Sequence, residues 1–274
     1  MKTSIPKTII ILSVLLICFN SFSQNIKKDS INDLINNAPS FTIFQDNYFI
    51  TGSSLDSPVS RSTSDAKYQI SFKQRLTKAT LPFNTYLFLT YTQKSFWKIY
   101  EESKPFAETN YNPALGLGKF FTNKNDLLRI VAVAFEHESN GKDSIYSRTW
   151  NRISFQYMQQ LTKMSSVTVK GWIPFGYKDD NPDLIKYVGY GEISYSQKLF
   201  NGQYVFDITS RKGMSWDDKG SVCAQFSYRL GKRNNQYLSV QYFTGYAESL
   251  IDYSEKTNMI RVGFVIKPSK SVFY

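Results

Sequence analysis

Cysteine, histidine and long apolar runs are what this sequence has least of. Its 274 residues include two cysteines and a single histidine, His137. Cys18 lies in an apolar N-terminal segment, so the rest of the chain holds only Cys223 and cannot form an internal disulfide. A polytopic helical membrane protein needs several apolar runs of about 20 residues. The sequence lacks them, so the chain must fold without disulfide bridges and without a bundle of membrane helices.

Clusters of basic residues are also scarce, although the chain as a whole is basic. Lys and Arg number 33 against 22 Asp and Glu, which gives a formal net charge of +11. Such a charge could indicate nucleic acid or an anionic surface as a partner. No Lys/Arg cluster exceeds three residues, and the N-terminus predicts export. We therefore expect no nucleic-acid partner and attribute the charge to nearby lipid headgroups or polysaccharide.

The N-terminus has the three parts of a secretory signal peptide. Lys2 and Lys7 precede an apolar stretch at residues 8–19, and small residues at 21–23 precede Gln24. This apolar stretch is too short to span a membrane comfortably. We predict a signal peptide at residues 1–23, an N-terminal leader at 24–40 and one transmembrane β-barrel at 41–274.

Aromatic residues are abundant, and polar and apolar residues alternate along most of the chain. The 19 Tyr and 21 Phe suit strands with two different faces. In the segment 151–157, for example, Ile153, Phe155 and Tyr157 alternate with polar residues, the pattern of a strand with one apolar face. About twelve such segments are predicted, near 41–51, 67–78, 84–97, 113–121, 127–138, 150–161, 166–175, 185–198, 203–211, 221–230, 236–244 and 258–267.

Twelve strands in an exported chain fit two architectures, a soluble sandwich or a transmembrane barrel. Their length suits the roughly 9–11 residues of a tilted membrane-spanning strand, and their number is even. Charges such as Arg152, Glu192 and Arg229 lie on the polar faces, where a barrel would bury them in its lumen. We therefore predict an all-β fold, a twelve-stranded antiparallel transmembrane β-barrel in the outer membrane of a Gram-negative bacterium.

Three polar residues interrupt the predicted lipid-facing side of two neighbouring strands. His137 and Ser139 share a face with the apolar residues 131, 133 and 135, and Asn151 shares one with Ile153. A lone histidine is usually a hydrogen-bonded structural residue, but polar groups that face hydrocarbon are costly and indicate function. Ser139 is then a candidate nucleophile, His137 its general base and Asn151 the group that orients the ring.

Neighbouring residues extend this hypothesis. The backbone N–H of Gly141 is a candidate donor to a developing oxyanion. A zinc site is disfavoured, because one histidine and one distant cysteine provide too few ligands.

The motifs around these residues resemble those of the outer membrane phospholipase A family. The resemblance rests on His-x-Ser-Asn-Gly at 137–141 followed by Ser-Arg-x-Trp-Asn-Arg at 147–152. Further blocks occur in the same order at 91–97, 105–111, 179–190 and 245–253. The family is identified with a twelve-stranded outer-membrane barrel, and the resemblance implies a calcium-dependent lipase with a Ser-His-Asn triad that is active as a dimer.

The resemblance also implies ligands for Ca²⁺ and a dimer contact. Carried over, the calcium ligands are the Lys142 carbonyl, the Ser147 hydroxyl and Ser103 from a second subunit, in a loop that is shorter here than in the family. Asp180 matches a residue of a second, weaker calcium site, with a solvated turn carboxylate as the alternative. Gln93 matches an interface glutamine in the membrane, with a glutamine bonded to headgroups as the alternative.

Three functions remain open at this point. The first is hydrolysis of acyl esters of phospholipids and lysophospholipids by a homodimer whose active site lies at the outer leaflet. The second is a non-catalytic barrel, a channel or a scaffold, with a vestigial triad. The third is a soluble periplasmic esterase with a sandwich fold.

Overall fold

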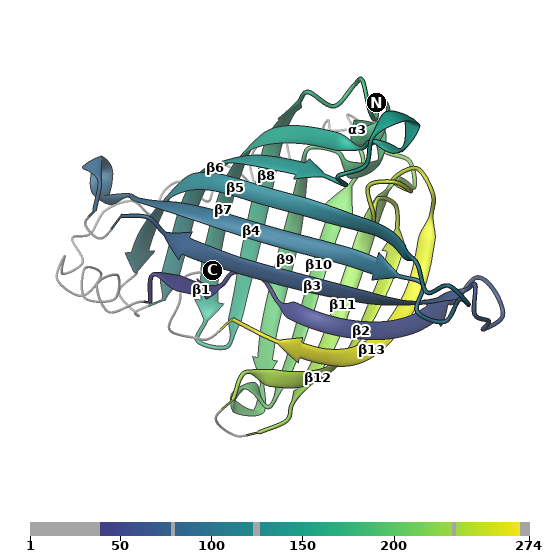
Figure 1. Ribbon diagram of the computed structural model, residues 1–274. Helices are drawn as coiled ribbons and strands as arrows, with labels where there is room; N and C mark the ends of the chain where they lie inside the picture. Colours follow the sequence, from purple (N-terminus) through teal and green to yellow (C-terminus); the bar gives the residue numbers. More distant parts are fainter. Residues whose placement is uncertain (1–38, 78–79, 123–126, 232–233, 269–274) are drawn as a thin grey trace, which may run out of the picture.

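The computed structural model describes residues 39–77, 80–122, 127–231 and 234–268. The predicted signal peptide and nearly all of the predicted leader lie outside these residues. One antiparallel sheet curls round until β3 pairs with β4 and closes a barrel (Figure 1). Its strands are β1 (Phe41–Ile43), β2 (Asn47–Ser54), β3 (Ser64–Arg75), β4 (Tyr86–Trp97), β5 (Phe106–Thr122), β6 (Leu128–Ser139), β7 (Thr149–Thr162), β8 (Ser165–Phe175), β9 (Gly191–Leu199), β10 (Tyr204–Lys212), β11 (Gly220–Arg229), β12 (Gln236–Gly245) and β13 (Thr257–Ile266).

The wall of the barrel has twelve strand positions although thirteen strands are assigned. β1 and β2 both pair with β3, with Phe41 opposite Gln74 and Tyr48 opposite Gln69. They therefore form one strand that is interrupted at residues 44–46. The prediction of a twelve-stranded antiparallel barrel is confirmed.

Apolar side chains face outward and polar side chains face the lumen. On β6 and β7, Phe135 and Phe155 are each 49% exposed, whereas Glu136 and Ser154 on the alternate positions are 5% and 3% exposed. In a soluble sandwich the apolar side chains would face inward. Apolar side chains exposed on the outside of a closed sheet are typical of a lipid-facing barrel. The sandwich alternative is thereby excluded.

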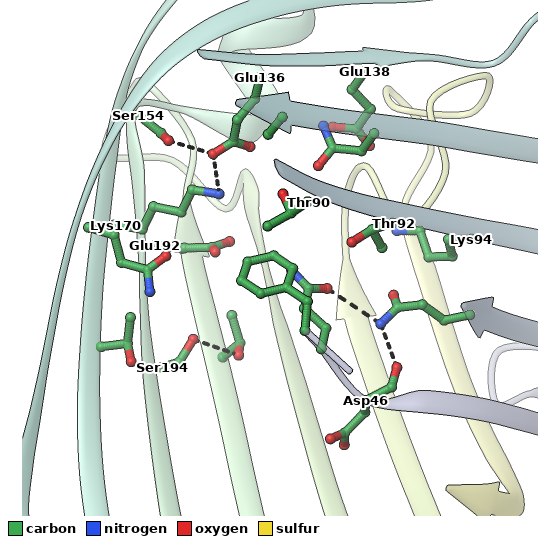
Figure 2. Close-up of a pocket in the computed structure, with 18 of the residues that line it drawn as sticks. Asp46, Thr90, Thr92, Lys94, Glu136, Glu138, Ser154, Lys170, Glu192 and Ser194 are labelled. Atoms are coloured by element: carbon green, nitrogen blue, oxygen red, sulfur yellow. Dashed lines mark hydrogen bonds and ion pairs between the residues drawn. The ribbon is translucent and has the colours of Figure 1, made fainter. Parts of the chain in front are cut away.

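Charged side chains in the lumen pair with one another around a cavity of about 550 Å³. Glu136 accepts from Lys170 at 2.7 Å and from Arg152 at 2.6 Å, and it projects inward beside Ser154 (Figure 2). The loop carboxylate Glu248 pairs in the same way with cations on two strands. Such pairing is required because a buried charge without a partner costs several kcal/mol, about 3–5 when one member of a pair is removed.

The predicted strand at 185–198 is wrong in its first part. A short helix, α3 (Leu184–Val188), occupies that stretch, and β9 begins at Gly191. Three of its apolar residues, Leu184, Ile185 and Val188, lie on one side of the helix and pack on Trp150 and Trp172. Alternation could not separate this run from a strand because it is only five residues long. Where the chain is described, no helix is long and apolar enough to cross a membrane.

The connections after β2, β4, β6, β8, β10 and β12 gather at one end of the barrel, here called the loop end. α3 and the segment 246–256 both lie there (Figure 1). β5 starts at Phe106 rather than near residue 113 as predicted, and so carries the 105–111 motif up to the loop end. Most residues of the candidate site therefore belong to the loop-end halves of β5, β6 and β7 or to the loops that follow.

Candidate active site

His137 and Asn151 lie directly opposite each other on β6 and β7. The antiparallel register pairs their Cα atoms, and Nδ1 of His137 lies 2.9 Å from Oδ1 of Asn151. An amide oxygen can only accept, so the ring must carry its hydrogen on Nδ1 to make this bond. The other ring nitrogen, Nε2, is then free to accept a proton.

Ser139 lies two residues further along β6 and on the same face as His137. Two residues of a strand span about 6.8 Å, and within the described residues no hydrogen bond joins Ser139 Oγ to the ring. Such bonds are often long or misaligned before substrate is bound. Tyr111 on β5 and Thr149 on β7 lie opposite Ser139 and flank it on the outer face.

His137, Ser139 and Asn151, the candidate triad, face away from the charged lumen. Glu136 and Glu138, which alternate with His137 along β6, point into the barrel (Figure 2). The outward neighbours of the triad are apolar, and Phe135, Ile153 and Phe175 are all 40% or more exposed. A hydrophobic acyl chain can therefore reach the hydroxyl from outside the barrel.

A proline beside His137 removes one hydrogen bond of the sheet, and an asparagine replaces it. Pro113 stands opposite His137 in the β5–β6 register and has no N–H to donate. The side chain of Asn112 donates to the His137 carbonyl instead, at 2.7 Å. This bond ties β6 to β5 at the level of His137.

Two glycines with left-handed backbone angles border the site. Gly141 has φ +65°, and a Cβ there would lie 3.0 Å from the ring of Tyr111. Gly176 has φ +58°, and a Cβ there would lie 2.9 Å from Nδ2 of Asn151. Only glycine adopts such angles at little cost. Both positions let the backbone approach a residue of the site closely.

The candidate calcium ligands lie in the segment 140–148 and beside it. The hydroxyl of Ser147 donates to Oδ2 of Asp180 at 3.2 Å, so these two oxygens are neighbours. Asn181, fully buried, binds both the N–H and the C=O of Thr149, at 3.2 and 2.9 Å, and holds the Asp180 segment against β7. Lys142 precedes Ser147 in the same loop.

These oxygens fit calcium better than a transition metal. Hydroxyl, carbonyl and carboxylate oxygens are the ligands that Ca²⁺ prefers, with waters completing the shell. Across the described ranges, no group of three His, Cys, Asp or Glu side chains is placed to hold a metal ion. A calcium ion here would depend largely on neutral oxygens, together with Asp180.

Comparison with known proteins identifies the family. The family model for phospholipase A1 matches residues 34–266. Phospholipase A1 of Escherichia coli K12 is 36% identical over 209 residues, which cover 74% of this chain and 69% of the relative. The chain belongs to the phospholipase A1 family. Family and fold together place it in the outer membrane.

Two solved structures of family members share the fold, each with a TM-score of 0.74 and 29% identity. One is the outer membrane phospholipase dimer of Salmonella typhi with bound calcium, which covers 89% of this chain and 99% of its own. The other is the E. coli outer membrane phospholipase A with an active-site asparagine replaced by alanine, which covers 88% and 99%. Both similarities extend over nearly the whole barrel.

In this phospholipase A1 family member, the predicted partner-subunit ligand Ser103 and the predicted interface residue Gln93 lie away from the other calcium candidates. Ser103 is exposed in the turn 98–105, and among the described residues no hydrogen bond joins it to Ser147 or Asp180. Gln93 lies on the outer face of β4, opposite Tyr111 and hence in the same row as Ser139. Its Oε1 accepts from Tyr91 at 3.0 Å.

Sequence reasoning missed the residues that support the site. They are three asparagine amides, a buried carboxylate and a glycine: Asn112, Asn140, Asn181, Glu108 and Gly176. Asparagine beside glycine or proline ordinarily indicates a turn. For Glu108, Asn140 and Asn181 the signal that could have found them is their position inside the motif blocks, whereas Asn112 and Gly176 lie outside those blocks.

Proposed function

We propose that this family member hydrolyses acyl esters of phospholipids and lysophospholipids with Ser139, His137 and Asn151 as its triad. The observation that carries the proposal is the 2.9 Å contact between His137 Nδ1 and Asn151 Oδ1, on the same lipid-facing surface as Ser139. Membership of the phospholipase A1 family supports the activity. The solved E. coli variant with an active-site asparagine mutation supports a role for asparagine.

In the proposed reaction Ser139 Oγ attacks the acyl carbonyl carbon while His137 Nε2 takes the hydroxyl proton. The imidazolium then gives this proton to the leaving alcohol oxygen, and an acyl-enzyme remains on Ser139. A water molecule, deprotonated by His137, attacks the acyl carbon, the bond to Ser139 Oγ breaks, and the imidazolium returns the proton to Ser139 Oγ as the fatty acid leaves. Asn151 holds the ring in the tautomer that both steps require.

The oxyanion forms beside hydrocarbon, where little water is available to solvate it. The N–H of Gly141 is the proposed backbone donor. The Lys142 carbonyl and the Ser147 hydroxyl would hold a calcium ion, with Asp180 contributing to this ion or to a second, weaker site. When bound, calcium supplies positive charge that stabilises the developing oxyanion.

A homodimer would complete the calcium site. Neutral ligands from one chain should bind calcium weakly, so a third ligand, Ser103 of a second copy, would raise the affinity. Gln93, on the lipid-facing row that contains Ser139, would help to hold the two barrels together. The calcium-bound dimer of the Salmonella typhi relative supports this arrangement.

Acyl release from phospholipid micelles, with and without calcium, tests the proposal. We expect hydrolysis that requires calcium and disappears in Ser139→Ala. A folded barrel that releases no fatty acid at saturating calcium would favour the alternative, a non-catalytic channel or scaffold with a vestigial triad. Heat-modifiable gel mobility establishes that each variant forms the barrel.

A further inference from the structure

A buried row of hydrogen bonds joins the segment 246–256 to the loop that follows the nucleophile. Its centre is Glu108 on β5, which is 2% exposed. Oε1 of Glu108 accepts from the side-chain amide of Asn140 at 3.0 Å, and Oε2 accepts from the N–H of Leu250 at 2.8 Å. Each carboxylate oxygen therefore binds a different segment of the loop end.

Asn140 in turn sets the shape of the loop 140–148. Its Nδ2 also donates to the carbonyl of Tyr146 at 2.8 Å. Its Oδ1 accepts from the N–H groups of Lys142 and Arg148, at 3.3 and 3.0 Å. One side chain thus holds three backbone groups, which lie beside Gly141 and on both sides of Ser147.

Glu108 decides which way the Asn140 amide points. A carboxylate only accepts, so it must face the NH₂ group of the amide and never its oxygen. With Nδ2 held by Glu108, Oδ1 is left facing the loop, where two N–H groups need an acceptor. A flipped amide would set oxygen against oxygen and leave those two N–H groups without their acceptor.

The segment 246–256 is itself fixed to the barrel wall. Glu248 pairs with Lys67 at 2.8 Å and with Arg261 at 2.7 Å. Arg211 donates to the carbonyls of Tyr246 and Ala247 at 3.0 and 2.9 Å. The N–H of Leu250 is therefore presented to Glu108 from a rigid support.

We propose that Glu108 is a positioning residue that, through Asn140, sets the calcium affinity of the loop 140–148, and that the segment 246–256 is part of this scaffold. The proposal rests on the proposed function, because it takes Lys142 and Ser147 as calcium ligands. In addition, the spacing of the Lys142 and Ser147 oxygens is fixed from the lumen side of the barrel wall by Glu108, which touches neither calcium nor substrate.

The variant Glu108→Gln tests the proposal because it keeps size and removes one acceptor. The glutamine NH₂ would face either Asn140 Nδ2 or the Leu250 N–H, and donor would meet donor. We expect the calcium concentration for half-maximal hydrolysis to rise about tenfold, given the cost of one unpaired buried group. Turnover should return at saturating calcium, and KM for phospholipid should not change. A merely destabilised barrel would not recover in this way.

Calcium binding without turnover provides the second readout. Calorimetric titration of calcium chloride into Ser139→Ala and into Ser139→Ala with Glu108→Gln should show about tenfold weaker binding in the double variant. Asp207→Asn is the matched control, because it removes a lumen carboxylate that pairs with Lys267 at 2.7 Å, away from the loop end. It should leave calcium affinity unchanged.

Each outcome bears on one of the two proposals. Wild-type calcium affinity in Glu108→Gln, or an equal loss in Asp207→Asn, overturns the positioning role and leaves the triad intact. Loss of calcium binding in the parent Ser139→Ala protein overturns both the calcium site and this inference. If Glu108→Gln does not fold, Glu248→Gln tests the proposal, because it weakens the attachment of the segment 246–256 to the barrel wall. A raised calcium requirement in this variant supports the proposal, and an unchanged requirement overturns it.

Discussion

Because Asn151, the third member of the proposed triad, is neutral, the effect of its removal on kcat can be predicted quantitatively. Asn151→Ala removes one hydrogen bond between neutral groups, which contributes a net of about 0.5–1.5 kcal/mol. At 1.36 kcal/mol per tenfold change in rate, kcat should fall roughly two- to tenfold. Ser139→Ala instead removes the atom that forms the covalent bond, and should lower kcat by about a millionfold. The loss in His137→Ala should be of the same order.

The assay is fatty-acid release from phospholipid micelles at saturating calcium and substrate, with heat-modifiable mobility as the folding control. Asn151→Asp is the matched variant, because it keeps an oxygen acceptor at the position that lies 2.9 Å from His137 Nδ1. We expect it to retain activity within a few-fold of wild type. Comparison of Asn151→Ala with Asn151→Asp then distinguishes the effect of losing the hydrogen-bond acceptor from the effect of losing the neutral amide.

Two results would refute this reasoning. Wild-type turnover in Ser139→Ala would contradict the assignment of Ser139 as the nucleophile. A loss in Asn151→Ala as large as that in Ser139→Ala would mean that Asn151 does more than orient the ring.

Four further predictions follow from the contacts of the site. Gly176→Ala should displace the Asn151 amide, which a Cβ would approach to 2.9 Å, and so lower kcat several-fold; a double-mutant cycle should show little further loss when Asn151 is already alanine. A chelator should abolish hydrolysis and Ser147→Ala should raise the calcium requirement, whereas full activity of a cross-link-verified monomer in chelator would contradict the calcium–dimer coupling. Ser194→Gln places a larger side chain in the lumen from β9 and should leave activity unchanged, because substrate approaches from outside. A clear loss of activity in the folded variant would instead indicate that substrate passes through the lumen. Burial opposes ionisation of Glu248, but its two cationic partners outweigh it and lower its pKa from 4.5 to about 2. Its stabilising contribution is therefore complete above about pH 4.5 and lost as the pH falls toward 2, so over that range wild type should lose thermal stability more steeply than Glu248→Gln.

The barrel could be predicted from the sequence because alternation reports directly which face of each strand is apolar. The same parity separated His137, Ser139 and Asn151 from Glu136 and Arg152 before any contact was known. The structure pairs His137 with Asn151 across two neighbouring strands. This pairing follows from the β6–β7 register, which is fixed because the apolar faces of both strands must point outward.

The supporting residues could not be predicted, for two physical reasons. Glu108 and Leu250 are 142 residues apart and meet only because the barrel closes. The α3 segment is only five residues long, too short for helical and strand periods to differ. Where a contact depends on closure or on a loop, the local pattern carries no information about it.

The two faces of β6 and β7 explain why an asparagine suits the third position of the proposed triad. The inward positions of these strands hold Glu136, Glu138 and Arg152, and the two carboxylates are neutralised by Arg152 and by Lys170 of β8. The outward positions face hydrocarbon, where Arg or Lys costs about 2–4 kcal/mol near mid-membrane, and where Asp or Glu also costs free energy, although less. A neutral amide orients His137 without that cost. It also stabilises the imidazolium less than a carboxylate would, so positive charge for the oxyanion must come from elsewhere. In the proposed mechanism that charge is calcium, held in the loop that follows the nucleophile, where water and the oxygens beside Ser147 are within reach.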